Sequence, residues 1–154
     1  MTQSRIKSIP NEILLQETAQ LIRQGHTVTH TVRGNSMNPF LIDRRDKVVL
    51  APFADSDLQR GAFVLGKDTT GKIVLHRIIK RESDVLTLMG DGNSLGTETV
   101  MVDQVAGLVT QIVRKGKTYS CKETVWKNYS SIWMRLSPLR RYLIGIWRRI
   151  HKIK

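Results

Sequence analysis

The sequence predicts a mainly β domain with one N-terminal helix and a basic, amphipathic helical tail. Three patterns lead to this fold class: apolar residues at helical spacing before residue 26, short strand-like runs separated by turns over 27–113, and aromatic and aliphatic residues recurring among arginines over 114–154. A chain of 154 residues can form one domain with a buried core plus an appended element. We therefore divide it into a helical segment (1–26), a β domain (27–113) and a tail (114–154).

The N-terminal helix is expected to begin after Pro10 and to end at Gly25. Proline is favoured at the first position of a helix and glycine just past its end. Two acidic residues, Glu12 and Glu17, lie toward the expected start. The apolar residues between these limits are sufficient for one packed face: Ile13, Leu14, Ala19, Leu21 and Ile22.

From Thr27 onward the pattern changes to short runs of β-branched and apolar residues. We expect strands near 27–33, 46–51, 62–67, 72–80, 84–89 and 105–113. The segment Asp68-Thr69-Thr70-Gly71 separates two of them and is typical of a hairpin connection. Alternation within the run at 72–80 places His76 on one face with Val74 and Ile78. Such a half-buried setting favours a neutral imidazole.

A serine, a histidine and an acidic turn form the pattern that carries chemistry. Ser36 lies in the polar turn Gly34-Asn35-Ser36-Met37-Asn38-Pro39, His76 lies in the strand-like run, and Gly90-Asp91 follows. A serine hydroxyl needs a base to attack an amide at neutral pH, and histidine suits that task because its pKa is near neutrality. The pattern predicts a serine hydrolase. Each residue also has a plain alternative role, Ser36 as a turn cap and His76 as a core histidine bonded to a backbone carbonyl.

At these residues the chain resembles the signal peptidase superfamily, which also contains the self-cleaving repressors related to LexA. The family's Ser-Met-x-Pro nucleophile box is similar to residues 36–39, and its Gly-Asp-x-Val strand entries resemble 45–49 and 60–64, with one substitution in each. His76-Arg77-Ile78 and the Gly-Asp-x-Asn box at 90–93 resemble the histidine subclass of archaeal and endoplasmic-reticulum signal peptidases. The resemblance spans roughly residues 30 to 110 and depends on the order of several boxes.

The resemblance implies a LexA/signal-peptidase-like β-fold and a serine endopeptidase that cleaves a leader or signal-like peptide. Ser36 would be the nucleophile and His76 the general base. The acid that orients His76 stays open, because glycine and threonine occupy positions 96 and 97, where the subclass has its aspartate. The candidates are Asp91, Glu98 and Asp103. Asp91 has an equally plain role in closing the Gly90–Gly92 turn.

Asn35 and Met37, on either side of Ser36, are candidates for oxyanion or substrate contacts. The resemblance places Met37 at the substrate site, and Asn35 could donate from its side chain, although a core role and a turn role are the respective alternatives. The backbone N–H of Ser36 is the first candidate donor to an oxyanion. We expect no cofactor and no metal, because the histidines are scattered along the chain at 26, 30, 76 and 151. The single cysteine, Cys121, excludes an internal disulfide.

The net charge of +12 is concentrated in the tail. Residues 114–154 contain twelve Lys/Arg and one acid, whereas residues 1–113 contain thirteen Lys/Arg and twelve acids. Apolar residues recur at helical spacing on both sides of Ser137-Pro138: Val125, Trp126, Tyr129, Ile132, Trp133, Leu136, Leu139, Tyr142, Leu143, Ile146, Trp147 and Ile150. The longest apolar run, 142–147, is far shorter than the roughly twenty residues of a membrane span.

We expect residues 122–152 to lie on an anionic membrane surface, with tryptophans inserted and arginines at the headgroups. A helix packed on the β domain is the alternative, and nucleic-acid binding is less favoured because the apolar face is large. The N-terminus has no apolar core of a secretory signal, so we expect a cytoplasmic protein, peripheral at the inner face of the membrane. There it would trim a leader from a dedicated peptide substrate. The competing functions are a non-catalytic peptide- or membrane-binding module and a repressor-like regulator.

Overall fold

The computed structural model describes residues 11–34, 36–93, 96–122 and 124–151. Its helices and strands follow in the order α1 (Asn11–Arg23), β1 (Val28–Thr31), β2 (Asp46–Ala51), β3 (Phe63–Lys67), β4 (Ile73–Glu82), β5 (Val85–Met89), β6 (Glu98–Met101), β7 (Val105–Arg114), β8 (Lys117–Ser120), α2 (Thr124–Arg135) and α3 (Arg140–His151). Short 3-10 helices lie at Asp55–Asp57, Val102–Gln104 and Ser137–Leu139.

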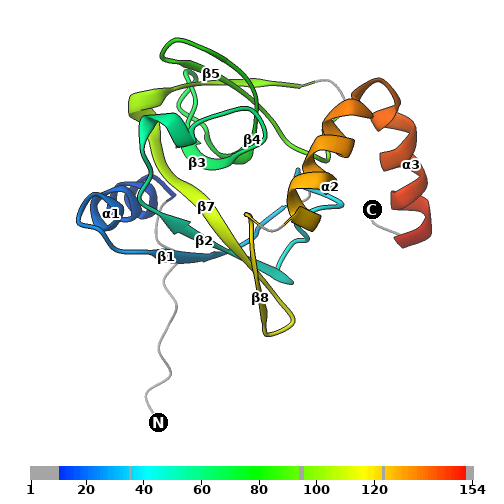
Figure 1. Ribbon diagram of the computed structural model, residues 1–154, viewed down its shortest axis with the longest axis horizontal. Coiled ribbons are helices and arrows are strands. Elements are labelled where there is room, and N and C mark those ends of the chain that lie inside the picture. Colours follow the sequence, from blue (N-terminus) through cyan, green and yellow to red (C-terminus); the bar gives the residue numbers. More distant parts are fainter. Residues whose placement is uncertain (1–10, 35, 94–95, 123, 152–154) are drawn as a thin grey trace.

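The strands form one antiparallel sheet that curls into a half-barrel (Figure 1). Their order across the sheet is β1-β2-β7-β3-β4-β5-β6, and β8 pairs with β7. Helix α1 lies at one end of the sheet, and α2 and α3 lie at the other (Figure 1). The coarse fold class, mainly β with an N-terminal helix and a helical C-terminal tail, is therefore confirmed.

Two four-residue strands were not expected from the sequence. β6 pairs with β5 through Leu86↔Val100, and β8 folds back on β7 through Arg114↔Lys117. The turn into β8 contains Lys115 and Gly116, both with positive φ. Because β8 belongs to the sheet, the expected boundary between β domain and tail at residue 114 falls inside a β-hairpin.

Helix α1 packs through a narrower face than its apolar residues predict. The buried side chains are Leu15, Thr18 and Ile22, spaced i, i+3 and i+7. Ile13, Leu14 and Leu21, which were expected on the packed face, are exposed, so that part of the prediction is wrong. The helix approaches β7 closely at Gly107, where a Cβ would lie 2.5 Å from Cδ1 of Ile22.

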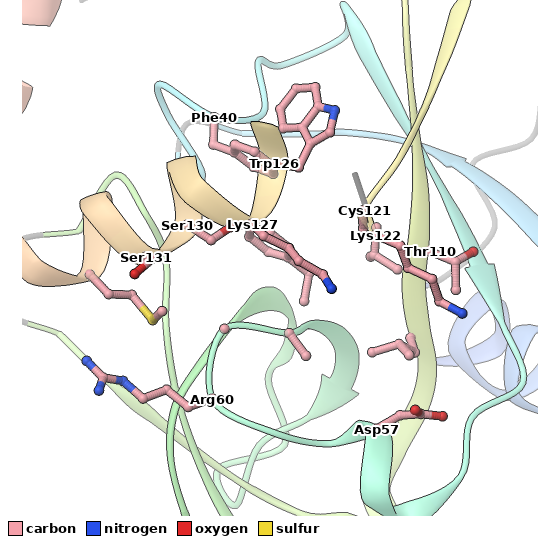
Figure 2. Close-up of a pocket in the computed structure, with 16 residues that line it drawn as sticks. Phe40, Asp57, Arg60, Thr110, Cys121, Lys122, Trp126, Lys127, Ser130 and Ser131 are labelled. Carbon is pink, nitrogen blue, oxygen red and sulfur yellow. The ribbon is translucent and has the colours of Figure 1, made fainter. Parts of the chain in front are cut away.

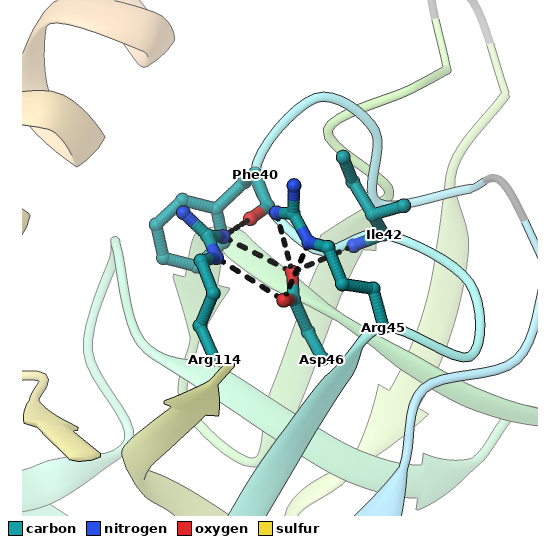
Figure 3. A network of polar contacts seen from close by, with 5 residues as sticks. All are labelled: Phe40, Ile42, Arg45, Asp46 and Arg114. Carbon is teal, nitrogen blue, oxygen red and sulfur yellow. Dashed lines mark hydrogen bonds and ion pairs between the residues drawn. The ribbon is translucent and has the colours of Figure 1, made fainter. Parts of the chain in front are cut away.

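A buried acid fixes the loop that follows Ser36. The Asp46 carboxylate is fully buried and accepts hydrogen bonds from Arg45, Arg114 and the backbone N–H of Ile42, and Arg114 also donates to the Phe40 carbonyl (Figure 3). Burial alone would raise the pKa of Asp46, but these hydrogen bonds outweigh it and lower the pKa below its ordinary value. The loop between Ser36 and β2 is thereby tied to β7.

Helix α2 packs against the β domain, contrary to the expectation of a separate membrane-surface element. Phe40 stacks on Phe63 at 4.7 Å and on Tyr129 at 4.9 Å, and meets Trp126 edge-on at 5.1 Å. Such aromatic contacts add to the stabilisation from burial. Among the residues described, no helix is long and apolar enough to cross a membrane.

Candidate active site

Ser36 and His76, forty residues apart, are hydrogen-bonded to each other. Nε2 of His76 lies 2.9 Å from Oγ of Ser36. His76 is on β4 and is 4% exposed, and Val74 and Ile78 on the same face of the strand are also buried. The alternation predicted for this strand therefore places the imidazole under the Ser36 turn.

Glu98 completes the chain of hydrogen bonds. Its Oε2 lies 2.8 Å from Nδ1 of His76, and the two side chains are 11% and 5% exposed. Glu98 begins β6, where the register Leu88↔Glu98 carries it to the edge of the sheet beside β4 and β5. With Nδ1–H donated to a carboxylate, the unprotonated Nε2 faces the serine hydroxyl, which is the tautomer a general base needs.

Asp91, a candidate for the acid that orients His76, is bonded to Arg77 instead. Its carboxylate accepts two hydrogen bonds from Arg77, at 2.8 Å from Nε and 2.6 Å from Nη2, and both side chains are fully buried. The Arg77 guanidinium lies 4.0 Å from the centroid of the Phe63 ring. Asp91 is therefore joined to Arg77 and not to His76. Asp103 lies in the 3-10 helix Val102–Gln104, next to the cavity under α1.

The Gly90–Gly92 turn lies against the backbone of Ser36 and Met37. The N–H of Gly92 donates to the Ser36 carbonyl at 2.7 Å, and the N–H of Asp91 lies 3.5 Å from the Met37 sulfur. A Cβ on Gly90 would collide with the Ser36 carbonyl and lie 3.1 Å from Nε2 of His76. Glycine is therefore required here, because a side chain would collide with the Ser36 carbonyl and crowd the His76 ring.

A groove of about 390 Å³ runs past the serine. Its lining is mostly apolar with a few polar groups: His30, Thr31, Val32, Arg33, Ser36, Met37, Val48, Leu50, Leu65, Lys72, Ile73, Val74, Leu75, His76 and Asn93. Met37 is buried and lies in the floor of this groove. Asn35 lies outside the described residues. Lys72 and Arg33 were not predicted as site residues, and no motif in the sequence marks them.

Two strand edges border this groove. β5 pairs with β4 only from Arg77 onward, so the described strands leave Ile73–His76 unpaired on that side. β1 stands at the end of the strand order and pairs with β2 alone. Unpaired edges of this kind can accept an extended peptide as an added strand.

His30, the other histidine that lines the groove, is hydrogen-bonded to Thr18 of α1. Its Nε2 lies 3.0 Å from Oγ1 of Thr18, whose hydroxyl donates to the Leu14 carbonyl at 2.7 Å. Since the hydroxyl proton is used, Nε2 of His30 must be the donor to Thr18. Burial lowers the pKa of His30, which favours the neutral ring. Within the described residues, no group of three or more His, Cys, Asp or Glu could hold a metal ion.

The helical tail has two different environments. On α2, Trp133 is buried and its Nε1–H donates to the Asp91 carbonyl at 3.2 Å, so neither Trp126 nor Trp133 is free to enter a membrane. On α3, one stripe is exposed and apolar: Leu139 just before the helix, then Tyr142, Ile146 and Ile150. Three arginines, Arg141, Arg148 and Arg149, are also exposed.

No protein-family model matches this chain, and no curated protein is significantly similar to it.

Proposed function

We propose that the protein is a serine endopeptidase in which Ser36 is the nucleophile, His76 the general base and Glu98 the acid that orients the base. The continuous chain of two hydrogen bonds, Ser36 Oγ to His76 Nε2 and His76 Nδ1 to Glu98 Oε2, carries this proposal. A nucleophile bonded to a base that is bonded in turn to an orienting group is the arrangement of an activated serine.

The reaction would proceed in two stages. His76 Nε2 takes the hydroxyl proton as Ser36 Oγ attacks the carbonyl carbon of the peptide bond, and Glu98 stabilises the imidazolium that forms. The proton then passes to the departing amine, which leaves an acyl ester on Ser36. Water attacks that ester, its proton returns through His76 to Ser36, and the acid product departs.

The groove supports an extended peptide as substrate. A strand lying between the unpaired edge of Ile73–His76 and β1 would bring a carbonyl past Ser36 with backbone hydrogen bonds on both sides. The floor beside Ser36 contains Met37 and Val74, both buried, so an apolar side chain next to the scissile bond fits best.

The order of the boxes supports a peptidase of the signal peptidase type, with a LexA-like fold, that trims a leader or signal-like peptide. In the histidine subclass the orienting residue is an aspartate, and we propose Glu98 for that role because its Oε2 lies 2.8 Å from Nδ1 of His76.

Attachment to the inner face of a membrane belongs to the same proposal, but only α3 provides the surface. Its exposed stripe of Tyr142, Ile146 and Ile150 and its exposed arginines suit an anionic bilayer. The full chain should bind vesicles that contain anionic lipid, and Ile146→Asp/Ile150→Asp should weaken that binding strongly. Equal binding of both proteins would contradict a role for α3, and binding to neutral vesicles serves as the control.

The enzymatic proposal is tested with a serine-directed acylating probe, such as a fluorophosphonate. The wild-type chain should be labelled at Ser36, as read by mass spectrometry of the modified peptide. Ser36→Ala should not be labelled, while Ser56→Ala, which changes an exposed serine outside the groove, should be labelled normally. A wild-type chain that neither reacts with the probe nor cleaves any member of a diverse peptide library would instead be a non-catalytic binding module.

A further inference from the structure

A second cavity, of about 470 Å³, lies between α2 and the sheet, away from the Ser36 groove (Figure 2). Its volume is in the range of small-molecule pockets, about 300–1,000 Å³. The apolar walls come from both sides: Phe40, Ala62, Phe63, Leu108, Val109, Trp126 and Met134. It shares no lining residue with the groove that contains Ser36 and His76.

The rim of this cavity is predominantly basic. Of the described lining residues, Arg60, Lys122 and Lys127 are basic and Asp57 is acidic, and all four are exposed. The Asp57 carboxylate already accepts the Ala54 N–H at 2.9 Å. Lys122 and Lys127 lie on one side of the cavity and Arg60 on the other (Figure 2). An apolar interior with a cationic rim fits a ligand with an apolar body and an anionic end.

The floor offers little to a peptide backbone. One edge of β7 is paired with β3 through Val64↔Leu108 and with β8 through Gln111↔Ser120. Between these pairs, the Thr110 carbonyl accepts the N–H of Cys121 at 2.9 Å. An added peptide strand would find these positions already bonded, whereas an alkyl chain needs no hydrogen bonds.

From this combination we infer that the cavity binds a long-chain fatty acid, with its alkyl chain along Phe63, Val109 and Trp126 and its carboxylate at Lys122 and Lys127. Burial of the alkyl chain provides the affinity, and the two ammonium groups provide the preference for an anionic head. This site is independent of the proposed peptidase chemistry.

Binding is measured on the full chain carrying Ser36→Ala, by calorimetry with octanoate, laurate and palmitate below their micelle concentrations. Each buried methylene should tighten binding about fourfold, so laurate, with four more methylenes, should bind roughly 200-fold more tightly than octanoate. Laurate should also slow alkylation of Cys121, which lines the cavity and is the only cysteine in the chain. Equal affinity for the two acids would overturn the inference.

Matched variants separate this site from other surfaces. Ser131→Trp fills the cavity from the half-buried face of α2 and should abolish binding. Lys122→Glu/Lys127→Glu should weaken the binding of laurate at least tenfold. The control Lys47→Glu/Lys117→Glu makes the same change of net charge at exposed strand positions and should leave laurate binding unchanged. Ile146→Asp/Ile150→Asp on α3 should leave laurate binding intact. Affinity that is lost in this α3 variant, or retained in Ser131→Trp, would place the fatty acid elsewhere and overturn the assignment.

Discussion

Two carboxylates, Asp91 and Glu98, lie seven residues apart in the sequence and bind adjacent residues of the same strand. Glu98 binds His76 at the edge of the groove, with a side chain that is 11% exposed. Asp91 binds Arg77 in the interior, where neither side chain is exposed. Because successive residues of a strand point to opposite faces, Glu98 meets the side of β4 that faces the groove and Asp91 meets the side that faces the interior. Asp91 is closer to His76 in the sequence than Glu98 is, yet Glu98 is the acid that contacts it, so sequence proximity does not identify the partner.

The largest effect on the rate of cleavage is expected from substitution of Ser36 or His76. Ser36→Ala and His76→Ala should each reduce kcat by a factor on the order of 10⁶, and the double variant should be no worse, because neither group works without the other. Cleavage of a reporter peptide in single-turnover experiments measures this. Full activity of His76→Ala would contradict the mechanism.

Glu98→Gln should reduce kcat by a factor on the order of 10⁴. The amide can donate to Nδ1, which would place the imidazole proton on Nε2, the wrong nitrogen for accepting the serine proton. Thermal unfolding should change little, since Glu98 is at the edge of the sheet.

Asp103→Asn is the matched control for Glu98→Gln, because Asp103 lies in the 3-10 helix before β7 and should retain full activity. If Glu98→Gln were fully active and Asp103→Asn inactive, the assignment of the orienting acid would be reversed.

Asp91→Asn should lower stability strongly and the cleavage rate only weakly, the reverse of what is expected for Glu98→Gln. It leaves the buried Arg77 charge without its partner, which costs about 3–5 kcal/mol of the free energy of unfolding. The rate per folded molecule, measured well below the unfolding midpoint, should fall far less than in Glu98→Gln. Denaturant unfolding followed in parallel with activity distinguishes the two roles. A normal midpoint with lost activity would show that Asp91 acts in the reaction.

The smallest effect is expected at Trp133, which ties α2 to the backbone of the same turn. Trp133→Phe keeps most of the buried ring but removes the donor to the Asp91 carbonyl, a loss of about 1 kcal/mol. Trp147→Phe on α3, whose ring stacks on His151, is the control and should be close to neutral. If both variants lost the same free energy of unfolding, the hydrogen bond from Trp133 to the Asp91 carbonyl would not contribute to stability.

The packing of α2 on the sheet determines what is expected when the tail is removed. Removal of the chain after Lys117 would strip Trp126 and Tyr129 from Phe40 and expose part of the core. We therefore expect that truncated chain to unfold. Removal of α3 alone tests membrane attachment without disturbing these contacts.

The sequence by itself determined the coarse fold class and most of the strands. Alternation over 72–80 and the turn residues at Asp68–Gly71 are local signals, and β3, β4 and the hairpin between them follow from them. The proximity of Ser36 and His76 was also predictable from the order of the sequence boxes, and the structure has Nε2 of His76 at 2.9 Å from Oγ of Ser36.

Only the tertiary structure decided which acid meets His76, which face of α1 is buried and where the tail leaves the domain. β6 and β8 have four residues each and little pattern of their own, so they exist as strands through pairing with β5 and β7. Glu98 reaches His76 by that pairing and not by its place in a motif. The tryptophans of α2 and the exposed stripe of α3 look alike in sequence, because amphipathic spacing records that a helix has an apolar face and not what covers it.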